Sequence, residues 1–179
     1  NVRQTPLHET LAKAGACFGV KNGWERANWF ARTEGRSFAA TPEAQYSFGR
    51  QNWFANHAAE HRAAREQVAL FDQSGFSKLQ VTGHDALPLL QRLCGNNVDV
   101  PVGKAVYTGL FNERGGFESD LTVIRQSADR FYLVTGTAQN IRDADWIRTH
   151  VRSGEDVQLV EVTSQTGVLG LMGPRARQV

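Results

Sequence analysis

The stretch from Phe111 to Arg125 reads FNERGGFESDLTVIR and constrains the fold more than any other part of the chain. Its polar start ends at Gly115-Gly116, and glycine adopts positive φ without steric cost, which is typical of a turn. Strand-forming runs flank this turn at Ala105–Phe111 and Phe117–Ile124. Two such runs joined by a loop of about five residues that contains glycine predict a β-hairpin.

The second strand of this hairpin alternates between two faces, since successive side chains of a strand point in opposite directions. The more apolar face is expected to meet the core and holds Phe117, Ser119, Leu121 and Val123. Asp120 lies on the opposite face, where a carboxylate must be solvated, paired or used. Because Tyr107 lies on the adjacent strand, both side chains are candidates for one site that holds a flat heterocycle with a basic nitrogen. The alternative is a surface aspartate that faces water.

Composition excludes several classes of protein. The 20 Lys and Arg and 18 Asp and Glu leave a net charge of +2, which argues against a dedicated nucleic-acid surface. No apolar run approaches the roughly 20 residues of a membrane span, and the first residues show no signal-peptide pattern. Cys17 and Cys94 are isolated in sequence. We interpret them as packing residues of a protein in a reducing compartment.

The remaining periodicity predicts an α+β fold with mostly antiparallel sheets and flanking helices, because strands outnumber helices and short turns join several of them. Helices are expected at 3–14, 52–69, 85–94 and 138–151, and further strands at 76–82, 131–135, 157–162 and 167–172. Residues 15–50 are rich in glycine and aromatic residues without a steady period and predict a long ordered loop.

We expect residues 1–50 to form an aromatic-rich segment that packs on a domain formed by residues 51–179. The last residues, MGPRARQV, resemble the opening of a helix, so we expect the domain to be truncated at its C-terminus.

Residues His57 to His61 spell H-x-x-E-H, the pattern of one class of zinc peptidase. The two histidines share a helical stripe with apolar residues that are expected to face inward, so partly buried structural histidines are the favoured reading. No third ligand is evident, and we predict no metal site. The chain also lacks G-x-G-x-x-G and the Lys-Ser/Thr that completes a P-loop, so it offers no phosphate loop for a nucleotide or flavin.

Several segments, in this order, resemble the folate-binding domain of the glycine-cleavage T-protein (aminomethyltransferase) family. They are TPLHETLAKAGACFG, GWERANWF, EHRAAREQVALFDQSGFSKLQVTG, VGKAVYTGLFNERGGFESDLTVIR, FYLVTGTAQNIRDADWI and LMGPRA. The resemblance covers almost the whole chain. The sequences of four segments are most similar to the C-terminal region of FAD-dependent dimethylglycine and sarcosine dehydrogenases. These segments are GWERANWF, SFGRQNWF, FDQSGFSK and GGFESDLTV.

The resemblance also implies a set of site residues. The Asp that closes the family's GG-x-x-x-D pattern falls on Asp120 and is the catalytic carboxylate. Folate contacts are implied for Tyr107, Phe76 and Asn112. Gly136 also belongs to the implied folate site, but T-proteins carry Asn there, so a polar contact is lost or shifts to another residue.

The function implied is capture of a one-carbon unit from an imine onto tetrahydrofolate, which gives 5,10-methylenetetrahydrofolate. FAD is expected only in a missing part of the same polypeptide, where it would oxidise an N-methyl amine, and the fragment alone is expected to be inactive. The alternatives are an aminomethyltransferase of the glycine cleavage system and a non-catalytic folate-binding regulator. The resemblance implies no nucleic-acid or membrane partner, and a location in the bacterial cytoplasm, or the mitochondrial matrix of a eukaryote.

Overall fold

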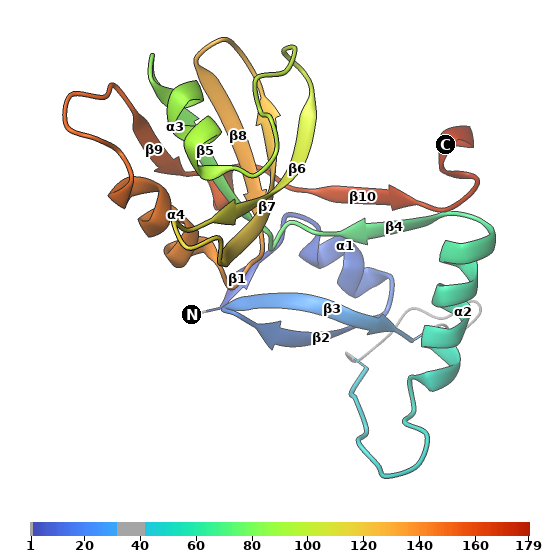
Figure 1. The fold of residues 1–179 in the computed structure, drawn as a ribbon. Helices are drawn as coiled ribbons and strands as arrows, with labels where there is room; N and C mark the ends of the chain where they lie inside the picture. The colour runs from blue at the N-terminus through green and yellow to red at the C-terminus, as the bar shows by residue number, and fades with distance from the viewer. Residues whose placement is uncertain (1, 32–41) are drawn as a thin grey trace. The chain divides into compact units, whose positions relative to one another are not determined.

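The computed structural model describes residues 2–31 and 42–179 (Figure 1). Its helices are α1 (His8–Lys13), α2 (Phe54–Glu66), α3 (Ala86–Leu93) and α4 (Asn140–Thr149), with 3-10 turns η1 (Thr163–Gln165) and η2 (Ala176–Gln178). Its strands are β1 (Arg3–Gln4), β2 (Ala16–Lys21), β3 (Trp24–Phe30), β4 (Ala69–Asp72), β5 (Ser77–Thr82), β6 (Ala105–Phe111), β7 (Phe117–Arg125), β8 (Arg130–Thr135), β9 (Gln158–Glu161) and β10 (Leu169–Met172). Within the described residues, every sheet pairing is antiparallel except that of β1 with β3, which confirms the predicted fold class.

The backbone contacts divide the chain into two compact units. Unit 1 comprises residues 1–75 and 167–179, and unit 2 comprises residues 76–166. The last residues belong to unit 1 because β10 pairs with β4. Neither boundary coincides with the division expected at residue 50, and the packing of residues 1–50 on the rest stays a prediction. Each helix of the described residues is too short or too polar to cross a bilayer.

Unit 1 contains a β-hairpin where the sequence predicted a loop. Strands β2 and β3 pair antiparallel and are joined at Asn22-Gly23, both with positive φ (52° and 78°). The predicted loop is therefore wrong for residues 16–30, and residues 32–41 lie outside the described part. Asn-Gly between two strands is a strong hairpin signal, which the irregular spacing of aromatic residues around it concealed.

Two helices of unit 1 are shorter than their patterns predicted. The helix expected at 3–14 begins only at His8, because Arg3 and Gln4 form β1 against β3. The helix expected at 52–69 ends at Glu66, and the chain then enters β4.

Helix α2 buries none of its side chains, so the prediction of partly buried histidines is wrong. His57 and His61 are both exposed, and His57 Nε2 lies 3.0 Å from the carbonyl oxygen of Asn28. Five of the 13 residues of α2 are alanine, which offers little apolar area for burial. The described residues contain no group of three His, Cys, Asp or Glu side chains that could hold a metal ion.

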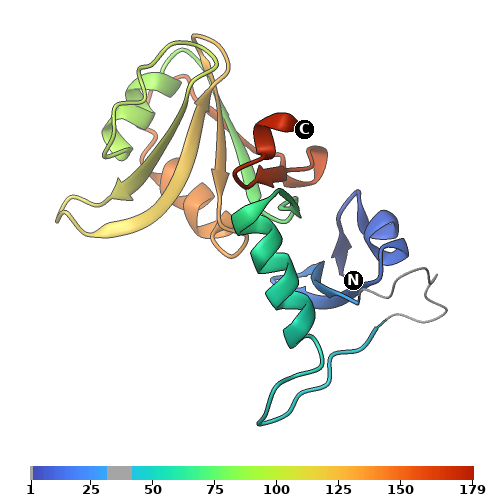
Figure 2. The same ribbon diagram turned by 90° about the vertical axis from the view of Figure 1, so that its right-hand side faces the viewer.

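Unit 2 is built on a sheet with the order β6-β7-β8-β5-β9, whose strands lie side by side in Figure 1. Helices α3 and α4 cover one face of this sheet. The core between them includes Leu79, Leu89, Leu90, Leu121, Val123, Phe131, Leu133 and Ile147. The opposite face of the sheet, called the outer face below, carries the alternate residues of each strand. The β6–β7 hairpin is coloured yellow, and its turn protrudes at the lower left of Figure 2.

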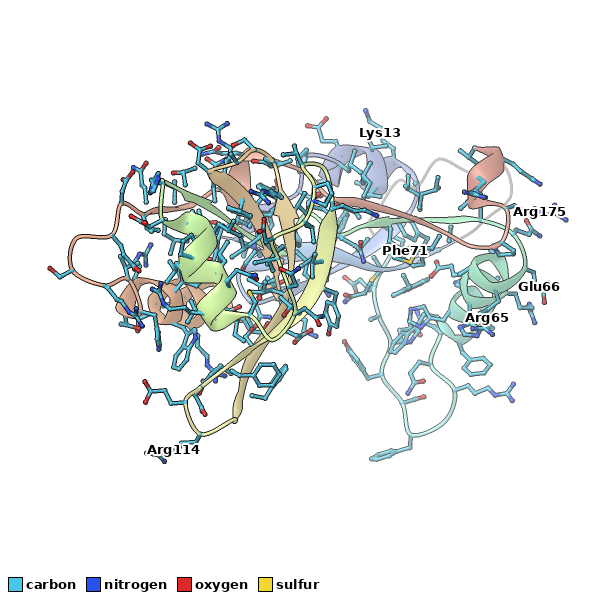
Figure 3. The ribbon with its side chains drawn as sticks, turned by 45° about the horizontal axis from the view of Figure 1, so that its top comes forward. Lys13, Arg65, Glu66, Phe71, Arg114 and Arg175 are labelled. Atoms are coloured by element: carbon cyan, nitrogen blue, oxygen red, sulfur yellow. The ribbon has the colours of Figure 1, made fainter. Side chains whose placement is uncertain are left out.

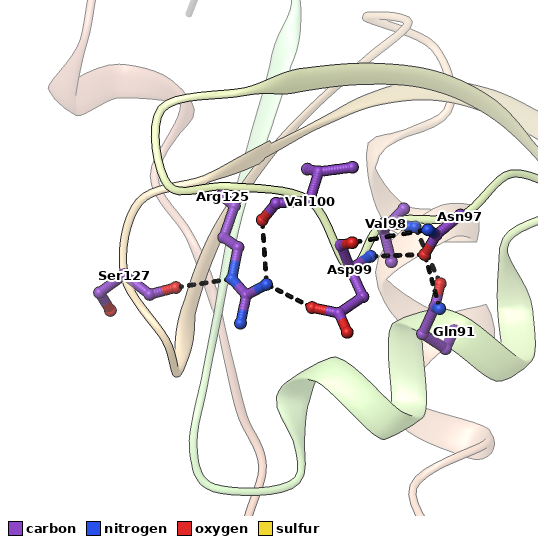
Figure 4. A network of polar contacts seen from close by, with 7 residues as sticks. All are labelled: Gln91, Asn97, Val98, Asp99, Val100, Arg125 and Ser127. Carbon is purple, nitrogen blue, oxygen red and sulfur yellow. Dashed lines mark hydrogen bonds and ion pairs between the residues drawn. The ribbon is translucent and has the colours of Figure 1, made fainter.

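A polar network holds the segment that leads into β6. The Arg125 guanidinium, at the end of β7, donates to the Asp99 carboxylate and to the carbonyl oxygens of Val100 (2.9 Å) and Ser127 (3.3 Å) (Figure 4). Gln91 of α3 binds the same segment from the other side. These contacts join the segment before β6 to the end of β7 and to α3.

Candidate functional site

The β6–β7 hairpin has the register that places Asp120 on the outer face. Gly109 pairs with Asp120, and Tyr107 pairs with Thr122. Ser119 is buried on the core face, whereas Asp120 is half-buried. The predicted hairpin and the predicted assignment of these residues to faces are confirmed.

Phe117 is an exception to the predicted alternation. Leu110 pairs with Ser119, but the next residue, Phe111, pairs with Phe117, so β7 has one extra residue, Glu118, at this point. A bulge of this kind shifts the alternation by one residue. Phe117 therefore leaves the core face, and 60% of its surface is exposed.

Tyr107 and Asp120 are diagonal neighbours across the strand pair, a separation that an aromatic side chain can span. The Tyr107 hydroxyl donates a 2.6 Å hydrogen bond to Asp120 Oδ2. This hydrogen bond, and then the negative charge of Asp120, raise the pKa of the Tyr107 phenol. Asp120 Oδ1 accepts no hydrogen bond from the described residues, so it can accept one from an N–H group of a bound molecule.

Two phenylalanine rings border the same carboxylate. Phe111 and Phe117 pack edge to face with ring centroids 5.8 Å apart. A Cβ atom on Gly109 would lie 2.9 Å from the Phe111 ring and 3.1 Å from the Phe117 ring, so both rings lie over this glycine. Gly109 is the residue that pairs with Asp120 across the two strands. A carboxylate between exposed aromatic side chains suits a flat heterocycle that presents an N–H donor.

Gly136 and Phe76 lie at the same level of the sheet as Asp120, one residue beyond the ends of β8 and β5. Thr135 of β8 pairs with Leu121 of β7 and with Ser77 of β5. Continued by one residue, this register places Gly136 and Phe76 level with the site carboxylate, on the outer face. Phe76 is 37% exposed. Their roles in folate binding stay predictions.

Gln139 occupies the space that a side chain at position 136 would need. A Cβ atom on Gly136 would lie 2.7 Å from Gln139 Oε1. This oxygen accepts a hydrogen bond from the Gly136 N–H at 3.2 Å. Glycine at this position therefore brings a different polar side chain to the edge of the site, which spacing alone did not reveal.

The Asn112 side chain forms its hydrogen bonds with other residues of the hairpin. Its Oδ1 accepts hydrogen bonds from the N–H groups of Arg114 (3.0 Å) and Gly116 (2.8 Å). Its Nδ2 donates to Glu118, which also pairs with Arg142 of α4, and these two contacts lower the pKa of Glu118. Arg114 marks the tip of the turn in Figure 3. These contacts explain the turn, and a folate contact of Asn112 stays a prediction.

Asp143 is a buried carboxyl group that the sequence analysis missed. On α4 the apolar Ile141 is 83% exposed, whereas the acidic Asp143 is 1% exposed. Asp143 Oδ2 forms hydrogen bonds with Ser119 Oγ (2.9 Å) and Thr135 Oγ1. Burial raises the pKa of Asp143. Its position one helical turn before the buried Ile147 is the signal that could have identified it.

Comparisons with known proteins agree on one family. The family model described as GCVT N-terminal domain matches residues 7–179. The chain is 43% identical over 179 residues to 4-methylaminobutanoate oxidase (formaldehyde-forming) of Paenarthrobacter nicotinovorans, of which it covers 21%. It is 35% identical to mitochondrial dimethylglycine dehydrogenase of Rattus norvegicus, with 99% of this chain and 20% of that protein covered.

Two further relatives differ in kind. The mitochondrial regulatory subunit of pyruvate dehydrogenase phosphatase of Mus musculus is 33% identical, with 99% of this chain and 20% of that protein covered. The crystal structure of the glycine cleavage system aminomethyltransferase T from Bartonella henselae matches with a TM-score of 0.76 at 24% identity, over 99% of this chain and 42% of that one. The chain thus has the T-protein fold and spans about a fifth of the length of the curated relatives it matches.

Proposed function

Because the chain belongs to the GCVT N-terminal domain family, we propose that it is the folate-dependent part of a longer demethylating flavoenzyme. Its task in this proposal is to capture a one-carbon unit from an imine onto tetrahydrofolate, which yields 5,10-methylenetetrahydrofolate. The observation that carries the proposal is the geometry of Asp120. One oxygen of this carboxylate is held by Tyr107, while the other is available among aromatic side chains.

Oxidation of the N-methyl amine in another part of the enzyme is supported by the names of two relatives, 4-methylaminobutanoate oxidase and dimethylglycine dehydrogenase. Since this chain covers only 20–21% of them and has no G-x-G-x-x-G, we assign FAD to another part of the polypeptide. The relatives come from a bacterium and from mitochondria, and we propose the bacterial cytoplasm or the mitochondrial matrix as the location.

In the proposed step, a nitrogen of tetrahydrofolate attacks the iminium carbon and forms a new N–C bond. A second folate nitrogen then bonds to the same carbon while its bond to the amine nitrogen breaks. The two protons lost by the folate nitrogens go to the released amine, so that atoms and charge balance. Asp120 Oδ1 accepts the hydrogen bond, and then the proton, of the attacking nitrogen, and its charge stabilises the cationic species. Tyr107 fixes the carboxylate through Oδ2.

The test compares Asp120→Asn with wild type in the full-length protein supplied with an N-methyl amine and tetrahydrofolate. We expect formation of methylenetetrahydrofolate to fall by about 10²–10⁴-fold, the usual contribution of a positioned acid–base group. Reduction of the flavin by the amine should not change. Asp145→Asn is the matched control, because Asp145 is an exposed residue of α4 and, within the described part of the chain, forms no hydrogen bond or ion pair with the site residues. Unchanged product formation by Asp120→Asn would refute the proposal.

A non-catalytic folate-binding role is the second candidate, because the chain is 33% identical to a regulatory subunit. In that case, the full-length protein would form no methylenetetrahydrofolate with either residue at position 120. The name of the oxidase relative adds a third outcome, since it describes formation of formaldehyde. Formaldehyde in place of methylenetetrahydrofolate, with tetrahydrofolate present in excess, would also contradict the proposal.

A further inference from the structure

The buried carboxyl group of Asp143 links the two strands that border the candidate site. It projects from α4 into the core, where Ser119 Oγ of β7 and Thr135 Oγ1 of β8 are both within hydrogen-bond distance of its Oδ2. All three residues are at most 2% exposed. Burying polar groups costs free energy unless their hydrogen bonds are satisfied. When all the hydrogen bonds are satisfied, such a cluster favours one arrangement of the strands.

Both hydroxyl groups lie next to the backbone of Asp120. Ser119 is the preceding residue of β7, and Thr135 Oγ1 lies 3.5 Å from the Asp120 carbonyl oxygen. Successive side chains of a strand point to opposite faces. Asp143 therefore holds this stretch of backbone from the core side, while Asp120 projects from the same stretch on the outer face. A shift of this backbone would move the carboxylate relative to Tyr107.

The number of hydroxyl hydrogens in the cluster indicates whether Asp143 must donate a hydrogen bond as well as accept one. Thr135 has one hydroxyl hydrogen but lies beside two side-chain acceptors, Asp143 Oδ2 and Gln139 Oε1 (3.2 Å). Both contacts are satisfied when Asp143 donates to Thr135, Thr135 donates to Gln139, and Ser119 donates to Asp143. A neutral group that both donates and accepts therefore satisfies the hydrogen bond from Ser119 and both side-chain contacts of Thr135. The raised pKa of Asp143 agrees with this arrangement.

We propose that Asp143 is a positioning residue for Asp120, and that it acts through Ser119 and Thr135 by hydrogen bonding and not by its charge. The inference rests on the proposed function, since it assumes that Asp120 is the carboxylate that acts on folate. Asp143 itself lies in the core and touches no substrate.

The experiment measures tetrahydrofolate-dependent product formation by the full-length protein with Asp143→Leu, Asp143→Asn and, as the matched control, Ile147→Val. Ile147 lies one turn further along the same buried face of α4. We expect Asp143→Leu to lower kcat for methylenetetrahydrofolate formation by about tenfold or more, since small displacements of a catalytic group are costly. Flavin reduction should be unchanged. Asp143→Asn should restore kcat to within about threefold of wild type, because Asn both donates and accepts. Ile147→Val should keep the wild-type kcat.

Two outcomes would overturn the inference: wild-type kcat in Asp143→Leu, or an equal loss in Asp143→Leu and Asp143→Asn. If Asp143→Leu does not fold, the double variant Ser119→Ala/Thr135→Val tests the same link, and wild-type kcat in that variant would likewise overturn it. The proposed function fails separately. If Asp120→Asn forms product normally, the assignment of Asp120 is wrong, whereas loss in Asp120→Asn with no effect at Asp143 rejects the positioning role alone.

Discussion

The phenol of Tyr107 donates a 2.6 Å hydrogen bond to the carboxylate of Asp120 across the β6–β7 strand pair. The two residues are 13 positions apart in sequence and meet because the turn between them brings β6 against β7. The contact fixes one oxygen of the carboxylate and leaves the other for a ligand. It also makes the ionisation of the phenol a reporter of the charge at Asp120.

Asp120→Asn should lower the pKa of Tyr107 relative to wild type. Ionisation of Tyr107 beside a carboxylate places a second negative charge next to the first and breaks the hydrogen bond, so removal of the charge favours the phenolate. A pH titration of tyrosinate absorbance measures the change. Since the chain has three tyrosines, the contribution of Tyr107 is obtained by subtracting the titration of Tyr107→Phe. An unchanged or higher pKa would show that the two groups do not interact in solution.

Tyr107→Phe should lower the rate of methylenetetrahydrofolate formation without abolishing it. The substitution removes one hydrogen bond that orients Asp120 but keeps the aromatic ring, and a hydrogen bond contributes about 0.5–1.5 kcal/mol, or roughly 2–10-fold. Steady-state kinetics of the full-length protein measure this loss. A loss as large as that of Asp120→Asn would instead make Tyr107 a catalytic group in its own right.

Asp143→Asn should become more stable relative to wild type as the pH rises from about 4 toward neutrality. The pKa of Asp143 is raised above its ordinary value of 3.8 in the folded state, so between the two values the folded chain holds a proton that the unfolded chain has released. The contribution of Asp143 to the stability of the wild type therefore falls with rising pH through this window, and Asn removes this contribution. Urea unfolding of both proteins at several pH values measures the difference. A difference that is independent of pH would contradict the raised pKa.

Gly83→Ala should destabilise unit 2 more than Gly103→Ala. Both glycines have positive φ, at 125° and 87°. Alanine at position 103 meets nothing within 4 Å, so it isolates the conformational cost of about 1–2 kcal/mol. A Cβ atom at position 83 would lie 2.1 Å from the carbonyl oxygen of Asp156, so the backbone itself must move. Urea unfolding measures the free energy of unfolding of the two variants. Equal losses of stability would show that the backbone at Asp156 can move away from residue 83 at little cost.

Cys94 should resist thiol reagents in the folded protein at pH 8. Burial raises the pKa of its thiol to about 12, so almost none of the reactive thiolate is present at that pH. A colorimetric thiol assay with Cys17→Ser, which leaves Cys94 as the remaining cysteine of this chain, measures the rate. The same variant in denaturant is the positive control. Rapid reaction under native conditions would place Cys94 outside the core.

The local sequence determined the elements of unit 2 and the place of Asp120. The paired glycines and the alternation that follows them predicted β6, β7 and the outer-face position of the carboxylate, because strand periodicity depends only on neighbouring residues. The same reasoning failed at Phe117, where one extra residue shifts the alternation. It also missed the β2–β3 hairpin, although Asn22-Gly23 carried the signal for it.

Only the tertiary structure decided which side chains meet. The hydrogen bond from Tyr107, the rings over Gly109 and the burial of Asp143 beneath Asp120 all depend on strands and a helix that are distant in sequence. Periodicity assigns a residue to a face, but its partners are set by register and by the packing of α4 against the sheet. For this reason the sequence could single out one carboxylate, whereas the second, hidden in the core, emerged only from the fold.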